Sequence, residues 1–158
     1  MADAPAVDAA VSSKAHAADL SLVHTGRCLC NAVSYSAKNL SDIWYCHCTQ
    51  CQKLTGLYIA AAGAKREDIS IAGPVSWLPI SDKSKSGHCA NCGSYLFWDS
   101  VDFDTLSVLA GGLDDASGLV VKGHIYVSQK AQYYEITDGL PQYEANPPAG
   151  TRTTEEHR

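Results

Sequence analysis

Short β-like runs make up most of the middle of the chain, and one of them alternates between apolar and polar residues. In the run at 32–37 (AVSYSA), Val33 and Tyr35 lie two positions apart, so a strand would turn both to one face. Further β-like runs follow at 57–63, 68–73, 75–80, 94–100, 105–111, 119–128 and 132–136. Turn signals separate them, at Gly63 and at 72–74, 81–87, 111–118 and 137–141. The pattern predicts one all-β domain from about Gly26 to Tyr143.

Helical periodicity is confined to short stretches. The best candidate is TQCQKLTG at 49–56, which Gly56 would close because glycine accepts the left-handed conformation that ends many helices. We therefore expect few and short helices.

The two ends differ in composition from this middle. We interpret 1–22 as a flexible, Ala-rich N-terminal extension, 23–144 as the folded domain and 145–158 as a polar C-terminal tail. Asp3 and Asp8 lie where a signal peptide carries positive charge. No stretch approaches the roughly 20 apolar residues that span a bilayer. We expect a cytoplasmic protein without a membrane partner, and the sequence leaves the oligomeric state open.

The charge balance bears on possible partners. Among 158 residues, 12 are Lys or Arg and 17 are Asp or Glu, which gives a formal net charge of −5. Nucleic-acid surfaces need clustered cations, so this balance argues against a nucleic-acid partner.

All seven cysteines lie in three short motifs. These are CLC (Cys28, Cys30), CHCTQC (Cys46, Cys48, Cys51) and CANC (Cys89, Cys92). An odd number cannot pair fully in disulfides, and C-x-C and C-x-x-C spacings without a secretion signal favour a metal. The alternative is a redox-active or partly oxidised set.

The spacing divides the cysteines between two zinc ions. A structural zinc takes four ligands, whereas a catalytic zinc keeps one position open. Cys46, Cys48 and Cys51 are too close in sequence to serve two distant metals, so we assign them to a catalytic zinc. Cys28, Cys30, Cys89 and Cys92 are then left for a structural zinc. The alternative is that a His or Asp closes the three-cysteine site, but a residue between two ligands, such as His47, usually points away from the metal.

The ligand type indicates the chemistry. Three thiolates on Zn²⁺ leave a net charge of −1, which makes the metal a poor activator of water. A substrate thiol in the open position would lose its proton readily, since coordination deprotonates thiols and zinc accepts soft ligands. The three-cysteine set therefore favours sulfur chemistry.

At these motifs the chain resembles the glutathione-dependent formaldehyde-activating enzyme family, which includes centromere protein V. The similar blocks are GRCLCNAVSY, CHCTQCQKLTG, CANCGSYLF, LAGGLDD and GHIYVSQKAQYYEITDGLPQYE, which together span about 26–144. The resemblance implies a β-tent-like fold of antiparallel sheets stapled by zinc. It also implies the same division into a structural and a catalytic zinc, two ions per chain.

The resemblance further implies a zinc-dependent carbon–sulfur lyase, or an enzyme that joins a thiol to an aldehyde. Glutathione adducts such as S-hydroxymethylglutathione are its candidate substrates. Two departures stand out: SGHCANC has Ser86 and His88 where the family usually has a basic and an aromatic residue, and Tyr133 replaces a common Trp. Ser86 removes a cation that could have met an anionic substrate.

Other residues are candidates for parts of this chemistry. His47 is the first candidate for proton transfer because it is nearest to the cysteines in sequence, followed by His88 and Tyr58. Trp44, Tyr45, Tyr58 and Trp98 are candidates for the walls of a pocket, or for core packing. Lys53 and Arg66 could meet a carboxylate.

Two other functions remain open from the sequence. The first is a non-catalytic zinc-binding module for protein or nucleic acid, which leaves the third cysteine motif surplus. The second is a methionine sulfoxide reductase on a related fold, with a zinc held by two C-x-x-C pairs. Only Cys48/Cys51 and Cys89/Cys92 have that spacing. Two zinc ions per chain would favour the lyase, and one would favour either alternative.

Overall fold

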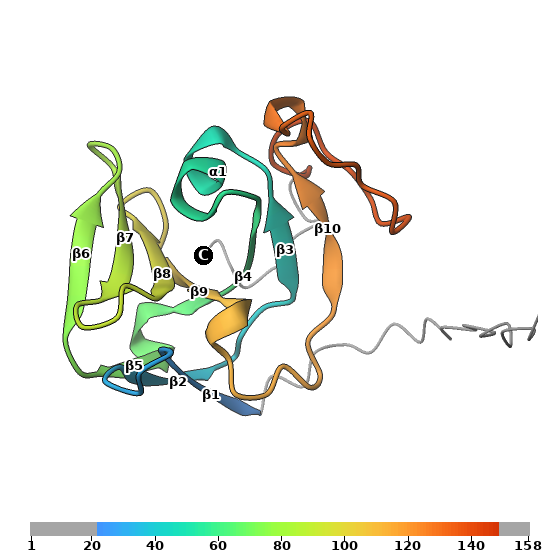
Figure 1. Ribbon diagram of the computed structural model, residues 1–158. Helices are drawn as coiled ribbons and strands as arrows, with labels where there is room; N and C mark the ends of the chain where they lie inside the picture. The colour runs from blue at the N-terminus through green and yellow to red at the C-terminus, as the bar shows by residue number, and fades with distance from the viewer. Residues whose placement is uncertain (1–21, 149–158) are drawn as a thin grey trace, which may run out of the picture.

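A computed structural model of the chain describes residues 22–148 (Figure 1). The predicted extension over 1–22 lies outside the described residues except for its last position, and the predicted tail over 145–158 is described only to 148. The described chain forms two β-sheets, and no helix within it is long and apolar enough to cross a membrane.

The smaller sheet has three strands in the order β1-β2-β5 and the larger sheet has seven in the order β10-β3-β4-β9-β8-β7-β6. The small sheet consists of β1 (Val23–Arg27), β2 (Ser34–Lys38) and β5 (Ile69–Ala72). The large sheet consists of β3 (Ile43–Cys46), β4 (Ile59–Lys65), β6 (Val75–Pro79), β7 (Ser84–Cys89), β8 (Tyr95–Ser100), β9 (Thr105–Leu109) and β10 (Val121–Ile125).

The strand pairing is antiparallel with one exception. β10 lies parallel to β3, with Ile125 opposite Cys46, and its register shifts between Val121 and Gly123. The prediction of an all-β fold built from antiparallel sheets is confirmed, and the parallel edge strand is an addition to it.

The core lies where the small sheet packs against the large one, at the lower side of Figure 1. Val33, Phe97 and Val108 are fully buried, and the rings of Tyr35 and Phe97 meet edge to face at 5.2 Å. Val33 and Tyr35 share the buried side of their segment, as their spacing predicts. Fully burying such a side chain contributes about 1.5–3 kcal/mol each, so this contact holds the two sheets together.

One α-helix, α1 (Thr49–Thr55), lies at the top of Figure 1, away from the small sheet. Cys48 caps its start, and Gly56 ends it at a φ of 81°, which confirms the short helix predicted for this segment. Three short 3₁₀ helices complete the described elements, η1 (Arg66–Asp68), η2 (Ala110–Gly112) and η3 (Val127–Gln129).

The structure corrects the type of secondary structure predicted for two segments. The segment 132–136, predicted as a strand, contains none. The segment 81–87, predicted as a turn, contributes four of the six residues of β7. Ser86 is fully buried there, and a Cβ at Gly87 would approach the Trp77 ring to 2.8 Å. This strand lacks large apolar residues at these positions because only small residues fit against Trp77 and Phe97 on the neighbouring strands.

Candidate metal centres and the cavity beside them

Cys46, Cys48 and Cys51 form a compact group that we call the three-cysteine cluster. Cys46 ends β3, Cys48 caps α1, and Cys51 lies one turn into the helix. Their sulfur atoms all lie within 4.8 Å of one another, and those of Cys48 and Cys51 are 3.2 Å apart. The strand end and the first helical turn therefore aim three thiols at one point.

The acidity of these thiols reflects their crowding. The hydrogen bond between Cys46 and Cys48 lowers the pKa of Cys48 to about 2 and raises the pKa of Cys46 to about 12. The pKa of Cys51 is also raised, first by its hydrogen bonds with Cys46 and Cys48. Crowding therefore disfavours three thiolates side by side, and a bound cation would favour them.

Cys28, Cys30, Cys89 and Cys92 form the four-cysteine cluster, whose sulfur atoms also lie within 4.8 Å of one another. The Cys28 and Cys30 sulfurs are 3.5 Å apart, and those of Cys30 and Cys89 are 3.8 Å apart. The Val33 amide donates to the Cys28 sulfur at 3.2 Å, and the Asn91 side-chain amide donates to Cys30 at 3.2 Å. Such donors suit thiolate acceptors.

Both clusters fit a zinc ion. All seven cysteines are free thiols, and their sulfurs lie well beyond the roughly 2.05 Å of a disulfide bond. Four sulfurs at about 2.3 Å from one zinc would lie about 3.8 Å from each other, close to the separations in the four-cysteine cluster. Cys48/Cys51 and Cys89/Cys92 belong to different clusters, so the single zinc site that a methionine sulfoxide reductase needs is not formed.

A cavity of about 400 Å³ opens beside the three-cysteine cluster, and all three of its cysteines line it. None of the four-cysteine cluster does so. Residues of four neighbouring strands of the large sheet line the cavity. Trp44 pairs with Ala61 on β4, and two residues further along β4 Gly63 pairs with Ser107 on β9, which pairs in turn with Trp98 on β8. Small side chains in the middle and tryptophans at both ends hollow out this face. Gly63, predicted in a turn, lies inside β4.

Among residues 22–148, no Asp, Glu, Lys, Arg or His lines this cavity. Of the two cations that the sequence suggested for a carboxylate, Lys53 is exposed on α1, and neither it nor Arg66 reaches the cavity wall. Arg66 pairs with Asp99 and donates to the carbonyls of Phe103 at 2.7 Å and Ser100 at 2.8 Å.

His47 belongs to a hydrogen-bond chain that runs from the protein interior to the exposed Asp138 and does not line the cavity. Its Nδ1 lies 2.5 Å from the Tyr134 hydroxyl and its Nε2 lies 2.8 Å from Nδ1 of His124. Nε2 of His124 in turn contacts Asp138 at 2.9 Å. Burial first, and then the charge of His124, lowers the pKa of His47 to about 4. The His47 ring is fully buried among these partners, and this geometry favours positioning of the chain between Cys46 and Cys48 over direct proton transfer to a substrate.

The remaining sequence candidates divide between the two sides of the sheet. Trp44 and Trp98 line the cavity, whereas Tyr45 and Tyr58 pack around the buried histidines. His88 stacks on Tyr95 and contacts the hydroxyl of Ser86 at 2.9 Å.

The two departures from the family pattern, Ser86 and Tyr133, also lie away from the cavity. Ser86 is fully buried in β7, and Tyr133 is exposed and donates to the Gly56 carbonyl at 2.7 Å. A cation of the protein at the position of Ser86, which we expected to meet an anionic substrate, would therefore not face this cavity.

Tyr95 is a candidate that the sequence analysis missed. Its hydroxyl is buried without a hydrogen-bond partner, and its side chain packs against the three-cysteine cluster. Burial first, and then the charges of the three thiolates, raises the pKa of Tyr95. The sequence offered only a Tyr three residues after the CANC motif. His124, Tyr134 and Asp138 were missed for a related reason, since only folding brings them to His47.

Known proteins resemble this chain in sequence and in fold. A family model described as glutathione-dependent formaldehyde-activating enzyme matches residues 23–129, a range that contains all seven cysteines. A crystal structure of a Rhodobacter sphaeroides protein, a structural-genomics target, superposes with a TM-score of 0.52 and 22% identity. That match covers 61% of this chain and 97% of the other, and it shows a shared fold. No curated protein matches the chain.

Proposed function

The chain belongs to the glutathione-dependent formaldehyde-activating enzyme family, and from that membership we propose that it is a zinc-dependent carbon–sulfur lyase centred on the three-cysteine cluster. In the proposed reaction a hemithioacetal, R–S–CH(OH)–R′, gives a thiol, R–SH, and an aldehyde, R′–CHO. The carbon–sulfur bond breaks, the carbonyl forms, and the hydroxyl proton ends on sulfur. The reverse direction is the addition of a thiol to an aldehyde.

One observation supports this proposal above the others. The three-cysteine cluster lines a cavity of about 400 Å³, and the four-cysteine cluster does not. A set of three ligands beside a cavity leaves space for a small molecule at a fourth position, whereas a complete set of four suits a structural role. We accordingly propose Cys46, Cys48 and Cys51 for the catalytic zinc and Cys28, Cys30, Cys89 and Cys92 for the structural zinc.

The protein's own groups would bind and orient the adduct. Trp44 and Trp98 bound the cavity on opposite sides, and the hydroxyl-bearing side chains of Thr105 and Ser107 line it between them. These hydroxyls can hold the adduct's own hydroxyl by hydrogen bonds. When bound, zinc would favour the thiolate form of a sulfur ligand, which makes that sulfur a better leaving group.

His47 has a positioning role in this proposal. Its ring is held by Tyr134 and His124, and its backbone carbonyl accepts a hydrogen bond from the Gln52 side chain at 2.6 Å. These contacts fix the backbone between Cys46 and Cys48, and so the distance between their sulfurs.

The alternative of a non-catalytic zinc-binding module has no comparable support. A binding module of this kind gives no reason for a three-ligand cluster beside a cavity. Free thiols at all seven cysteines suit a reducing compartment, so the cytoplasm remains our proposed location.

The test combines metal content with turnover. The protein purified with zinc should contain two zinc ions per chain and should accelerate the breakdown of hemithioacetals formed from small thiols and formaldehyde. One zinc per chain would contradict the proposal. Two zinc ions per chain without faster breakdown of any of these hemithioacetals would also contradict it.

A further inference from the structure

We infer that the cavity beside the three-cysteine cluster selects an uncharged, apolar thiol or its aldehyde adduct, with an aromatic or branched group on sulfur, and disfavours an anionic peptide such as glutathione. This inference rests on the proposed function, because it assumes that the sulfur of the ligand meets the three-cysteine cluster. The inference concerns the charge and shape of the group attached to that sulfur.

The walls supply the first argument. Trp44 on β3 and Trp98 on β8 line the cavity from the strands that flank β4 and β9, and Phe103, Ile59 and Ile125 add apolar surface. Flat aromatic side chains on both sides of a small floor favour a flat or bulky apolar group through burial and ring contacts. The polar lining groups are neutral hydroxyls and amides, among them Ser107, Thr105 and Gln129.

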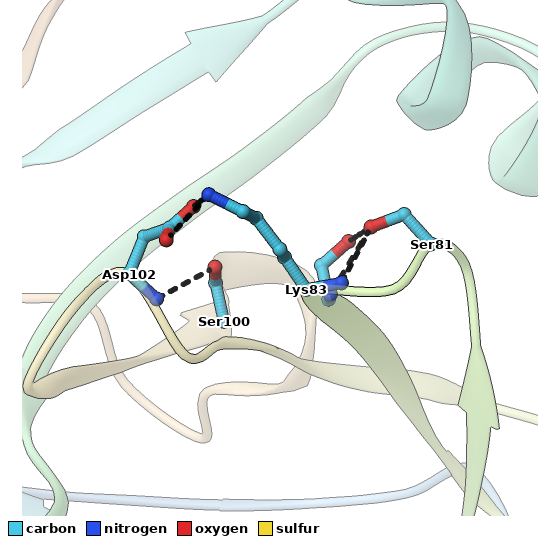
Figure 2. A network of polar contacts seen from close by, with 5 residues as sticks. Ser81, Lys83, Ser100 and Asp102 are labelled. Carbon is cyan, nitrogen blue, oxygen red and sulfur yellow. Dashed lines mark hydrogen bonds and ion pairs between the residues drawn. The ribbon is translucent and has the colours of Figure 1, made fainter.

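The absence of a cation supplies the second argument. No Lys, Arg or His within residues 22–148 lines the cavity. Arg66 and Lys83 are engaged elsewhere: Arg66 pairs with Asp99, and Lys83 pairs with Asp102 at 3.0 Å. Figure 2 shows Lys83 directed at Asp102, the residue that precedes Phe103 in the chain.

Three other cations around the large sheet also have partners. Lys122 pairs with Asp42 at 3.0 Å, Lys85 with Asp99 at 3.4 Å, and Lys130 donates to the carbonyls of Ala131 and Tyr134.

Glutathione carries two carboxylates and one ammonium group at neutral pH. An anionic group drawn into a cavity without a cation loses hydration and gains no partner, which disfavours binding. An uncharged apolar group avoids this loss and buries surface against the tryptophans. The wall composition therefore favours neutral over anionic ligands.

The test uses two matched pairs of ligands and isothermal titration calorimetry on the zinc-loaded protein. The thiol pair is phenylmethanethiol and 4-(sulfanylmethyl)benzoate, which differ only by a carboxylate. The alcohol pair, benzyl alcohol and 4-(hydroxymethyl)benzoate, repeats the comparison without sulfur. We expect each neutral ligand to bind about 10-fold or more tightly than its carboxylate partner.

A cation placed in the cavity should reverse the preference. Ser107→Lys adds an ammonium group to the middle of the floor and should bring the carboxylate ligand level with, or ahead of, the neutral one. Thr105→Arg provides the same test if Ser107→Lys does not fold. Ser70→Lys, at an exposed position on β5 away from the cavity, is the matched control and should retain the preference of the parent.

The outcomes separate this inference from the proposed function. Equal affinity for neutral and anionic ligands, tighter binding of glutathione than of phenylmethanethiol, or no response to the added cation would overturn the inference. A preference for neutral ligands in both pairs, with the thiols no better than the alcohols, would support the cavity assignment and count against sulfur binding at the three-cysteine cluster.

Discussion

Cys48 has two separate roles that one substitution can divide. Its sulfur belongs to the three-cysteine cluster, and it also caps α1 by accepting from the amide of Cys51. Serine is a good helix cap but a poor zinc ligand beside two thiolates. The residue therefore connects the start of a helix with the proposed metal centre.

Cys48→Ser should fold, hold about one zinc per chain and lose lyase activity. The expected loss of stability is small, because the three cysteines are close in sequence and close no long loop. Elemental analysis measures the zinc content, and circular dichroism measures whether the variant is folded and how stable it is. Cys48→Ala is the control, since it removes the cap as well and should cost about 1 kcal/mol more. Global unfolding of the serine variant would make this cluster structural.

Tyr95 offers a second test at the residue scale. Its hydroxyl is buried without a hydrogen-bond partner, and its side chain packs against the group that contains Cys51. Tyr95→Phe should therefore leave zinc affinity at this cluster unchanged and raise the melting temperature, because an unsatisfied buried hydroxyl costs about 1–3 kcal/mol. Competition with a chromogenic chelator and thermal melting measure the two quantities. A weaker affinity for zinc would contradict this and show that the hydroxyl supports the metal ligands.

At the scale of elements, the hydrogen bonds that link His47, His124 and Asp138 join the end of β3, β10 and the segment that follows η3. His124 also anchors that segment through its backbone, since its amide donates to Pro141 at 2.8 Å and its carbonyl accepts from Tyr143 at 2.9 Å. The last described part of the domain is thus held to the strand that ends in Cys46.

His124→Leu and Asp138→Asn should differ strongly. The leucine leaves His47 buried with one ring nitrogen unpaired, which costs about 1–3 kcal/mol. Asn at 138 keeps an oxygen acceptor at a side chain that is 41% exposed, so we expect less than about 1 kcal/mol. Urea denaturation compares the two variants. Equal losses would mean that the buried pair of histidines contributes no more than the surface contact.

The elements also show what the sequence could predict. Short β-like runs between turn signals identified the segments of seven strands, and the glycine after KLT identified the end of α1, because these signals are local. β7 was missed because its buried positions are Ser86 and Gly87, which are small to suit Trp77 and Phe97 on other strands. The segment 132–136 has aromatic residues like a strand, but Tyr134 serves the histidine chain instead.

For the site, the sequence grouped the cysteines in the same sets of three and four that the fold brings together, since ligand spacing is a local pattern. It did not reveal the cavity. Trp44, Gly63, Ser107 and Trp98 are spread over four strands, and only the pairing of those strands brings them to one cavity. It also gave His47 a proton-transfer role that its full burial and its ring partners do not favour.

At the scale of the whole molecule, the four-cysteine cluster connects distant parts of the chain. Cys30 and Cys89 are 59 residues apart, and the cluster joins the turn after β1 to the turn between β7 and β8. A metal held there stabilises the folded chain directly, because the ligands come together only on folding.

Cys92→Ser should therefore destabilise the entire domain, in contrast to Cys48→Ser. Structural zinc contributes on the order of 10 kcal/mol in small zinc peptides, and the core of this domain makes the loss smaller but still several kcal/mol. Thermal melting with and without a strong chelator measures it, and the chelator should lower the parent's melting temperature toward that of the variant. A variant that melts like the parent and keeps two zinc ions would refute the division of ligands.

The most direct test of the account is a crystal structure of the zinc-loaded protein soaked with phenylmethanethiol, with anomalous data collected at the zinc edge. We predict one anomalous peak in each cysteine cluster. The thiol sulfur should lie about 2.3 Å from the zinc of Cys46, Cys48 and Cys51, with the ring in the cavity between Trp44 and Trp98. A peak at the four-cysteine cluster alone, or a protein side chain fixed as the fourth ligand of the other zinc, would contradict the account.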